Sequence, residues 1–219
     1  MLTYTLIRTL LIFAICDLIL LLFAVNAGAA ATTDDTAKAS RQLRKTTERT
    51  LRDVNKYVSQ LDETEQALSQ VKKADDGNLR KRYGSFSGEV SDLEKAQTRA
   101  MAEIGKMRSV GTDYFSSWDK ANTQIQDQEL RLASSRRRAI VVEKHRVLAD
   151  ALSEIGVRLQ PFMSHLHDIK SFLGADLSPA NVAKAREMIE ESRIEADALK
   201  ERIKNVQAML EEFLRSSIE

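Results

Sequence analysis

The sequence predicts an all-α protein, an elongated antiparallel four-helix bundle with coiled-coil-like heptad packing. Charged residues make up 30% of the 219 positions and aromatic residues only 5%, a composition typical of long solvated helices. Eight Gly and two Pro leave few places to turn, and apolar residues recur in heptads along much of the chain. A pair of helical hairpins that packs against another protomer is the main alternative.

The clearest heptad repeat runs from Leu148 to Leu173. Its apolar positions alternate at steps of four and three: Leu148, Leu152, Ile155, Leu159, Phe162, Leu166, Ile169 and Leu173. Because an α-helix turns every 3.6 residues, this repeat keeps one apolar stripe toward a partner helix. An isolated helix would leave these side chains in water, so we expect other helices to cover them.

Residues 1–31 are predicted to be a signal peptide or an N-terminal membrane anchor. The apolar run from Thr9 to Val25 is followed by an alanine-rich stretch that fits signal-peptide cleavage. With those alanines the run reaches about 20 residues, enough to span a bilayer. Asp17 adds about 2.5–3.5 kcal/mol to the insertion of a lone span, which slightly favours cleavage.

A single helical-bundle domain is expected over residues 38–219, after a segment at 32–37 that should be a short polar tether or the fraying start of the first helix. Its first helix should cover residues 38–73, with Glu65 at one position where the heptad expects an apolar residue. Gly77 is suited to a left-handed conformation after this helix, and Asn78 to capping the next. The predicted apolar stripe of the first helix is Leu51, Val54, Val58, Leu61, Leu68 and Val71.

The second and third helices are expected at residues 79–125 and 128–173. Their heptad registers differ by one residue, which predicts a turn near Gln126 and Asp127, with Asp127 as the helix cap. A continuous helix with a stutter is the competing interpretation. Pro161 should bend the third helix, because its nitrogen cannot donate to a carbonyl.

The fourth helix is expected at residues 179–216. Ser178 and Pro179 form a typical helix start, with a capping hydroxyl followed by proline at the first helical position. One polar residue, Ser192, interrupts its apolar stripe. The stripe is Val182, Ala185, Ile189, Ala196, Leu199, Ile203, Val206, Leu210 and Phe213.

Several motifs, clearest after Leu79, together resemble a bacterial exported family, domain of unknown function 2959. They are Gly77 to Tyr83 followed by Glu89, Tyr114-Phe115-x-x-Trp118, Glu129-Leu130-Arg131, Leu159-x-Pro161-Phe162-Met163 and Phe172 to Ala175. The resemblance implies an envelope location and a helical fold, and it carries over no catalytic residues. Many members look like lipoproteins with a cysteine at the end of the signal. In this chain a bulky isoleucine precedes Cys16, which departs from that pattern.

The sequence offers no residues for a catalytic, cofactor or metal site. His165 and His167 are two positions apart, about 200° around a helix, so they cannot share a metal ion. No glycine-rich phosphate loop occurs. We therefore expect a protein that is not an enzyme and needs no cofactor. The formal net charge of +1 predicts no nucleic-acid partner.

Two groups of residues are candidate contact surfaces. Tyr114, Phe115 and Trp118 form the one aromatic cluster and should fill the end of the bundle or receive a partner. Basic residues near the start of the first helix and after the second turn should meet at the same end of the bundle, where they would form a collar on anionic lipid headgroups. These basic residues are Arg41, Arg44, Lys45, Arg136, Arg137 and Arg138.

The sequence therefore favours a non-enzymatic structural or adaptor protein of the bacterial cell envelope. It would lie in the periplasm or be anchored in the inner membrane facing the periplasm. Its partners would be another protein, a second copy of itself, or anionic lipid headgroups. A periplasmic ligand-sensing or lipid-handling bundle is the alternative, favoured by a cavity lined by Ala100, Gly111 and Ala121. An intracellular nucleic-acid-binding coiled coil is a further alternative, supported only by Arg136 to Arg138.

Overall fold

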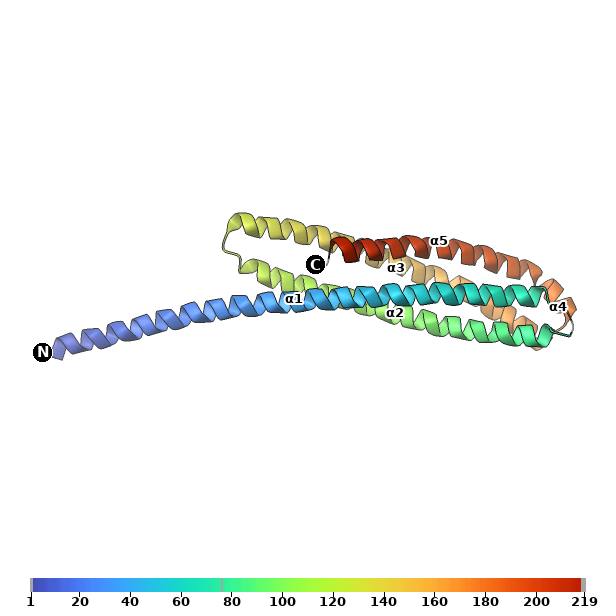
Figure 1. Cartoon of the computed structure of the whole chain (residues 1–219), viewed down its shortest axis with the longest axis horizontal. Helices are drawn as coiled ribbons and strands as arrows, with labels where there is room; N and C mark the ends of the chain where they lie inside the picture. The colour runs from blue at the N-terminus through green and yellow to red at the C-terminus, as the bar shows by residue number, and fades with distance from the viewer. Residues whose placement is uncertain (1, 76, 218–219) are drawn as a thin grey trace.

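The computed structural model describes the backbone of residues 2–75 and 77–217, and the side chains of residues 34–75 and 77–217. This part of the chain is all-helical, as predicted, and forms an elongated helical bundle (Figure 1). The predicted signal peptide or anchor at residues 1–31 lies outside the described side chains. The five helices of the described chain are α1 (Leu2–Lys72), α2 (Leu79–Thr123), α3 (Gln128–Ala175), α4 (Pro179–Lys184) and α5 (Arg186–Ser216).

The long helices pack in a closed order. α1 lies against α2 and α5, and α3 also lies against α2 and α5. The predicted apolar stripes of α3 and α5 are buried along their length, from Leu148 to Leu173 and from Ile189 to Phe213. Across residues 34–75 and 77–217, helices with the length and apolar character needed to cross a membrane are not found.

α1 continues through residues 34–37, where the sequence suggested a polar tether. No Gly or Pro interrupts the helix there, and the Thr36 hydroxyl donates to the Ser117 carbonyl of α2 at 3.1 Å. This contact attaches the segment to the bundle, so the tether prediction is wrong for these residues.

Three threonines hold α1 against α2 at equal intervals. The hydroxyls of Thr36, Thr50 and Thr64 lie 3.1, 3.3 and 3.3 Å from the carbonyls of Ser117, Glu103 and Glu89. Each step is two heptads on both helices, and residue numbers fall in α2 as they rise in α1. The two helices therefore keep one constant register over the whole interface.

The buried stripe of α1 differs from the predicted one. Leu51 and Val58 are only partly buried, whereas Thr47, Thr50 and Thr64 are fully buried. Each of these hydroxyls also donates to a carbonyl one turn earlier in α1, at 2.7–3.0 Å. A hydroxyl satisfied by its own helix can be buried, which a prediction from apolar residues misses. The stripe is Leu43, Thr47, Thr50, Val54, Tyr57, Leu61, Thr64, Leu68 and Val71.

The turn between α2 and α3 confirms the predicted break. Asp127 has extended backbone angles, and its carboxylate accepts from the Leu130 N–H at 2.9 Å. The continuous helix with a stutter is therefore wrong. α3 runs unbroken through Pro161, and the predicted helix start at Ser178 is confirmed by its hydrogen bond from the Asn181 N–H.

Two local predictions are corrected. Gly77 does not adopt a positive φ, and Asn78 makes no side-chain cap. Asp75 closes this turn instead, because its Oδ1 accepts from both the backbone N–H and the side-chain amide of Asn78 at 3.0 Å.

The predicted helix at residues 179–216 is divided at Ala185. Its ψ of −7° departs from the helical value, while the hydrogen bonds from the Ala185 N–H to Asn181 and from the Ile189 N–H to Ala185 persist at 2.9 Å. The change of direction lets α4 contact α1, α3 and α5 together.

Candidate functional site

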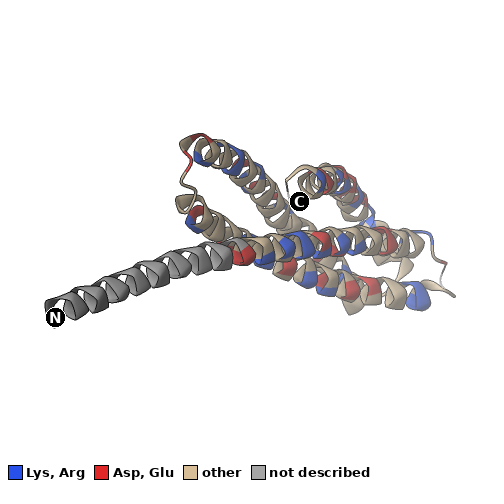
Figure 2. Ribbon diagram, turned by 60° about the vertical axis from the view of Figure 1, so that its left-hand side comes forward, with Lys and Arg blue, Asp and Glu red and all other residues tan. Residues whose placement is uncertain are grey.

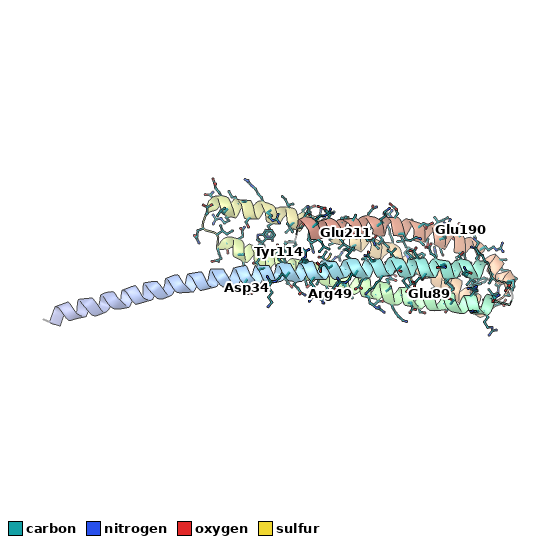
Figure 3. The ribbon with its side chains drawn as sticks, viewed as in Figure 1. Asp34, Arg49, Glu89, Tyr114, Glu190 and Glu211 are labelled. Carbon is teal, nitrogen blue, oxygen red and sulfur yellow. The ribbon has the colours of Figure 1, made fainter. Side chains whose placement is uncertain are left out.

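The α2–α3 hairpin extends beyond the C-terminal end of α5 (Figure 1). The Lys144 ammonium donates to the hydroxyl of Ser216, the last residue of α5, at 2.9 Å. The part of α3 before this level, from Gln128 to about Ile140, therefore has no described α5 residue beside it. Figure 3 shows Tyr114 of α2 and Asp34 of α1 at this end of the bundle, beyond the last turn of α5, and Glu211 near the end of α5.

The predicted aromatic cluster lies at this end of α2. The Tyr114 ring is 5.3 Å from that of Phe115 and 5.4 Å from that of Trp118, both in tilted arrangements. Tyr114 and Phe115 are buried, whereas Trp118 is half-buried and donates from its indole nitrogen to the Ser134 hydroxyl at 3.0 Å. The cluster packs α2 against α3 and leaves one indole edge near the surface.

The α3 stripe becomes polar where α5 ends. Continuing its heptad backward from Val141 gives Arg138 and then Ser134. The Arg138 guanidinium lies 2.5 Å from the Asp119 carboxylate and 6.0 Å from the centre of the Phe115 ring. These contacts give Arg138 polar and aromatic partners on α2 where α5 no longer covers the α3 stripe.

Tyr114 connects the uncovered parts of α1 and α3. Burial raises the pKa of its phenol, while a hydrogen bond with Ser40 of α1 and the nearby charge of Arg137 of α3 act to lower it. The phenol of Tyr114 is thus influenced by residues of both α1 and α3 at the end of the bundle that α5 does not reach.

The predicted basic collar divides into two kinds of residue. Arg41, Lys45, Arg136 and Arg137 are exposed, whereas Arg138 is half-buried against α2. Arg44 is exposed and forms an ion pair with Glu48 at 3.3 Å. Lysines and arginines elsewhere alternate with acidic residues over the bundle (Figure 2).

The sequence did not reveal that Gly111 and His145 fit together. His145 is buried, and a Cβ atom at Gly111 would fall on its imidazole ring. The ring lies 5.3 Å from Phe115, edge to face, and 5.8 Å from Phe213 of α5. Burial lowers the pKa of His145, and its Nε2 has no hydrogen-bond partner. The glycine therefore gives space to a neutral histidine that joins α2, α3 and α5.

The other histidines face different partners. His165 lies 2.9 Å from Glu195 of α5, and His167 lies 2.7 Å from Glu94 of α2. Over the part of the chain whose side chains are described, no group of three His, Cys, Asp or Glu residues could hold a metal ion.

A small cavity of about 60 Å³ lies between α1, α3 and α5. Its lining includes the buried Thr64, Phe162 and Ser192, and the Ser192 hydroxyl has no partner. This volume suits a few water molecules and is far below the several hundred Å³ of a typical ligand pocket. The space before Gly111, which the ligand-sensing alternative would use, is filled by His145.

Glu65, the polar residue in the predicted stripe of α1, has a specific partner. The Lys200 ammonium of α5 lies 2.6 Å from its carboxylate and also 3.1 Å from Asp62 and 3.2 Å from Asp197. The Lys200 side chain is one-quarter exposed. Burial acts to lower the pKa of Lys200, but hydrogen bonds to its three carboxylate partners together raise it above the usual lysine range. The pair joins α1 to α5.

These features define an all-helical bundle in which the identified polar side chains mainly connect helices to one another. The sequence matches the family described as "Protein of unknown function (DUF2959)" over residues 42–216, and the chain belongs to this family. No curated protein and no solved structure matches it.

Proposed function

We propose that this protein is a non-enzymatic structural or adaptor protein of the bacterial cell envelope, built as an elongated antiparallel four-helix bundle with heptad packing. The observation that carries the proposal is the buried stripe along each long helix, from Leu43 to Val71, Leu79 to Phe115, Val141 to Leu173 and Ile189 to Phe213. Such a rod can hold two partners apart or present a surface at a fixed distance.

The geometry supports a rigid rod over a hydrolase or transferase. Tyr57, Ser192 and His145 carry buried polar atoms without partners at separate levels of the bundle. Burial and the charge of the nearby Arg108, whose Nε also has no partner, act to lower the pKa of His145. Catalysis needs a nucleophile or base beside a group that orients it. The clearest connected side-chain group, Lys200 with Glu65, Asp62 and Asp197, spans α1 and α5 as an ion-pair network.

The proposed location rests on the N-terminal sequence. An apolar run followed by small residues directs export or anchors a chain. Only a few residues separate this run from Asp34, where the described side chains of α1 begin, so an uncleaved run would hold the bundle close to the membrane.

Envelope fractionation combined with N-terminal sequencing of the mature protein tests this function. We expect the protein in the envelope or periplasmic fraction, starting near residue 32 if the segment is cleaved and at residue 1 or 2 if it is retained. Recovery only from the cytosol would contradict the proposal.

The basic collar on anionic lipid is a separate part of the proposal, and vesicle flotation tests it. The chain lacking residues 1–31 should float with anionic vesicles more than with neutral ones, because Lys and Arg near a surface contribute about 1 kcal/mol each. Equal recovery with both vesicles would remove the collar and leave the adaptor role unchanged.

A further inference from the structure

The end of the bundle beyond α5 has two helix faces that the described α5 does not cover. On α1, α5 contacts Asn55 through Gln207 and Asp62 through Lys200. Arg41 stands two heptads before Asn55 and three before Asp62, so it belongs to the same face. The nine residues that follow Gln207 carry α5 only to about the level of Thr46. Arg41 therefore lies beyond its end, and so does the exposed Asp34, one heptad before Arg41 on the same face.

The corresponding face of α3 continues in the same way. α5 contacts Lys144 through Ser216 and Glu154 through Arg202. Arg137 and Leu130 stand one and two heptads before Lys144, and Ile140 stands two heptads before Glu154. Leu130 is 65% exposed and Ile140 is 60% exposed. We call Arg41, Leu130, Arg137 and Ile140 the open face, with the buried Tyr114 between its two sides.

We propose that the open face binds an acidic amphipathic α-helix of a partner protein, which takes the position that α5 occupies along the rest of the bundle. This inference rests on the adaptor role proposed above and names the chemistry of its partner. Apolar residues of the partner would cover Leu130 and Ile140, and its carboxylates would meet Arg41 and Arg137.

α5 forms ion pairs of both polarities with its neighbours: Lys200 and Arg202 meet carboxylates of α1 and α3, while two other pairs have the polarity proposed here. At its last turns Glu212 lies 3.9 Å from Lys144 of α3, and near its start Glu190 lies 3.2 Å from Lys72 of α1. An acidic helix at the open face would repeat the contact between Glu212 and Lys144 one heptad earlier in α3, at Arg137.

Charge disfavours two other occupants. The segment Gln128–Ile140 of a second copy carries four arginines and one glutamate, so two such segments would repel each other. The collar proposal assigns the same Arg41 and Arg137 to an anionic membrane, so lipid headgroups and a partner helix would compete for these arginines. An anionic membrane approached end-on would first meet Asp127 and Glu129, which are exposed at the α2–α3 turn. The arginines lie along the side of the hairpin, where a helix can run parallel to them.

A peptide-binding experiment on the full chain in zwitterionic nanodiscs tests the proposal. The probe is a designed helix with Leu at a and d and Glu at e and g, and its counterpart has Lys in place of Glu. Trp118, the single tryptophan, lies beside Tyr114 and reports binding by fluorescence. We expect saturable binding of the acidic peptide, weakened by salt, and no binding of the basic one.

Matched variants locate the contact. Arg137→Glu should weaken binding of the acidic peptide at least about tenfold and allow the basic peptide to bind. Lys120→Glu makes the same charge change on an exposed residue of α2 and should leave the affinity unchanged. Ile140→Asp should weaken binding, whereas Val157→Asp, at a 73% exposed position of α3, should not.

Four outcomes would overturn the proposal. They are no saturable change in Trp118 fluorescence, equal binding of both peptides, equal effects of Arg137→Glu and Lys120→Glu on the affinity for the acidic peptide, and a fluorescence change with anionic vesicles equal to that with the acidic peptide. A dimer in sedimentation that Arg137→Glu dissociates would assign the open face to a second copy and overturn it too. Envelope fractionation of the cells that produce the protein keeps the two proposals separate. A protein found in the envelope that binds neither peptide retains the adaptor role and loses this partner.

Discussion

Gly111→Ala should destabilise the bundle relative to Gly105→Ala, although both variants place the same methyl group on α2. The new Cβ at Gly111 falls on the His145 imidazole, while that at Gly105 has no neighbour within 4 Å. Replacing Gly by Ala inside a helix stabilises it by about 1 kcal/mol, and forcing a methyl group into a packed core costs about 1–3 kcal/mol. The first contribution is common to both variants, so their stabilities should differ by about 1–3 kcal/mol.

Chemical unfolding followed by far-ultraviolet circular dichroism measures this difference. In the His145→Ala background the clash is gone, so Gly111→Ala should there become stabilising, as Gly105→Ala is. Equal shifts of the two glycine variants in the wild-type background would show that the imidazole does not occupy the space before Gly111, and the reasoning would fail.

Three further predictions concern pH, an ion pair and a proline. Because burial lowers the folded-state pKa of His145 below the ordinary 6.5, the unfolded chain binds more protons, and stability should decrease as pH falls from 6.5 to the folded pKa; a His145→Gln variant that keeps this pH dependence would refute the assignment. Lys200→Met should destabilise by about 1–3 kcal/mol because it leaves Glu65 half-buried without its cation, whereas the exposed Lys204→Met should change unfolding by less than about 0.5 kcal/mol. Pro161→Ala should raise the unfolding midpoint, by up to about 3 kcal/mol in free energy, because α3 is helical on both sides of this exposed position; an unchanged midpoint would contradict this.

Heptad reasoning predicted α3 and α5 well because their buried positions are almost all large and apolar. Val141, Leu148 and Leu173 lie where the repeat places them, and the register mismatch located the turn capped by Asp127. His145 also fell on the stripe, although its fit against Gly111 could not be predicted, because that pairing depends on how α2 and α3 are aligned.

The same reasoning failed for α1, because polarity there does not indicate exposure. Thr50 and Thr64 are buried with their hydroxyls bonded, and the more apolar Leu51 and Val58 are only partly buried. The open face was also missed. Arg41 and Arg137 were noticed as basic residues, but only the position of α5 shows that they belong to one uncovered side.

The equal spacing of Thr36, Thr50 and Thr64 has a consequence for how this hairpin can change in length. All three hydroxyls reach α2 carbonyls in one register, so inserting a single residue in the middle of α1 would rotate every later threonine by about 100° away from α2. Insertions should be accepted only when α1 and α2 lengthen together by whole heptads. The spacing therefore restricts the length of the α1–α2 hairpin, which can change only by matched whole heptads in both helices.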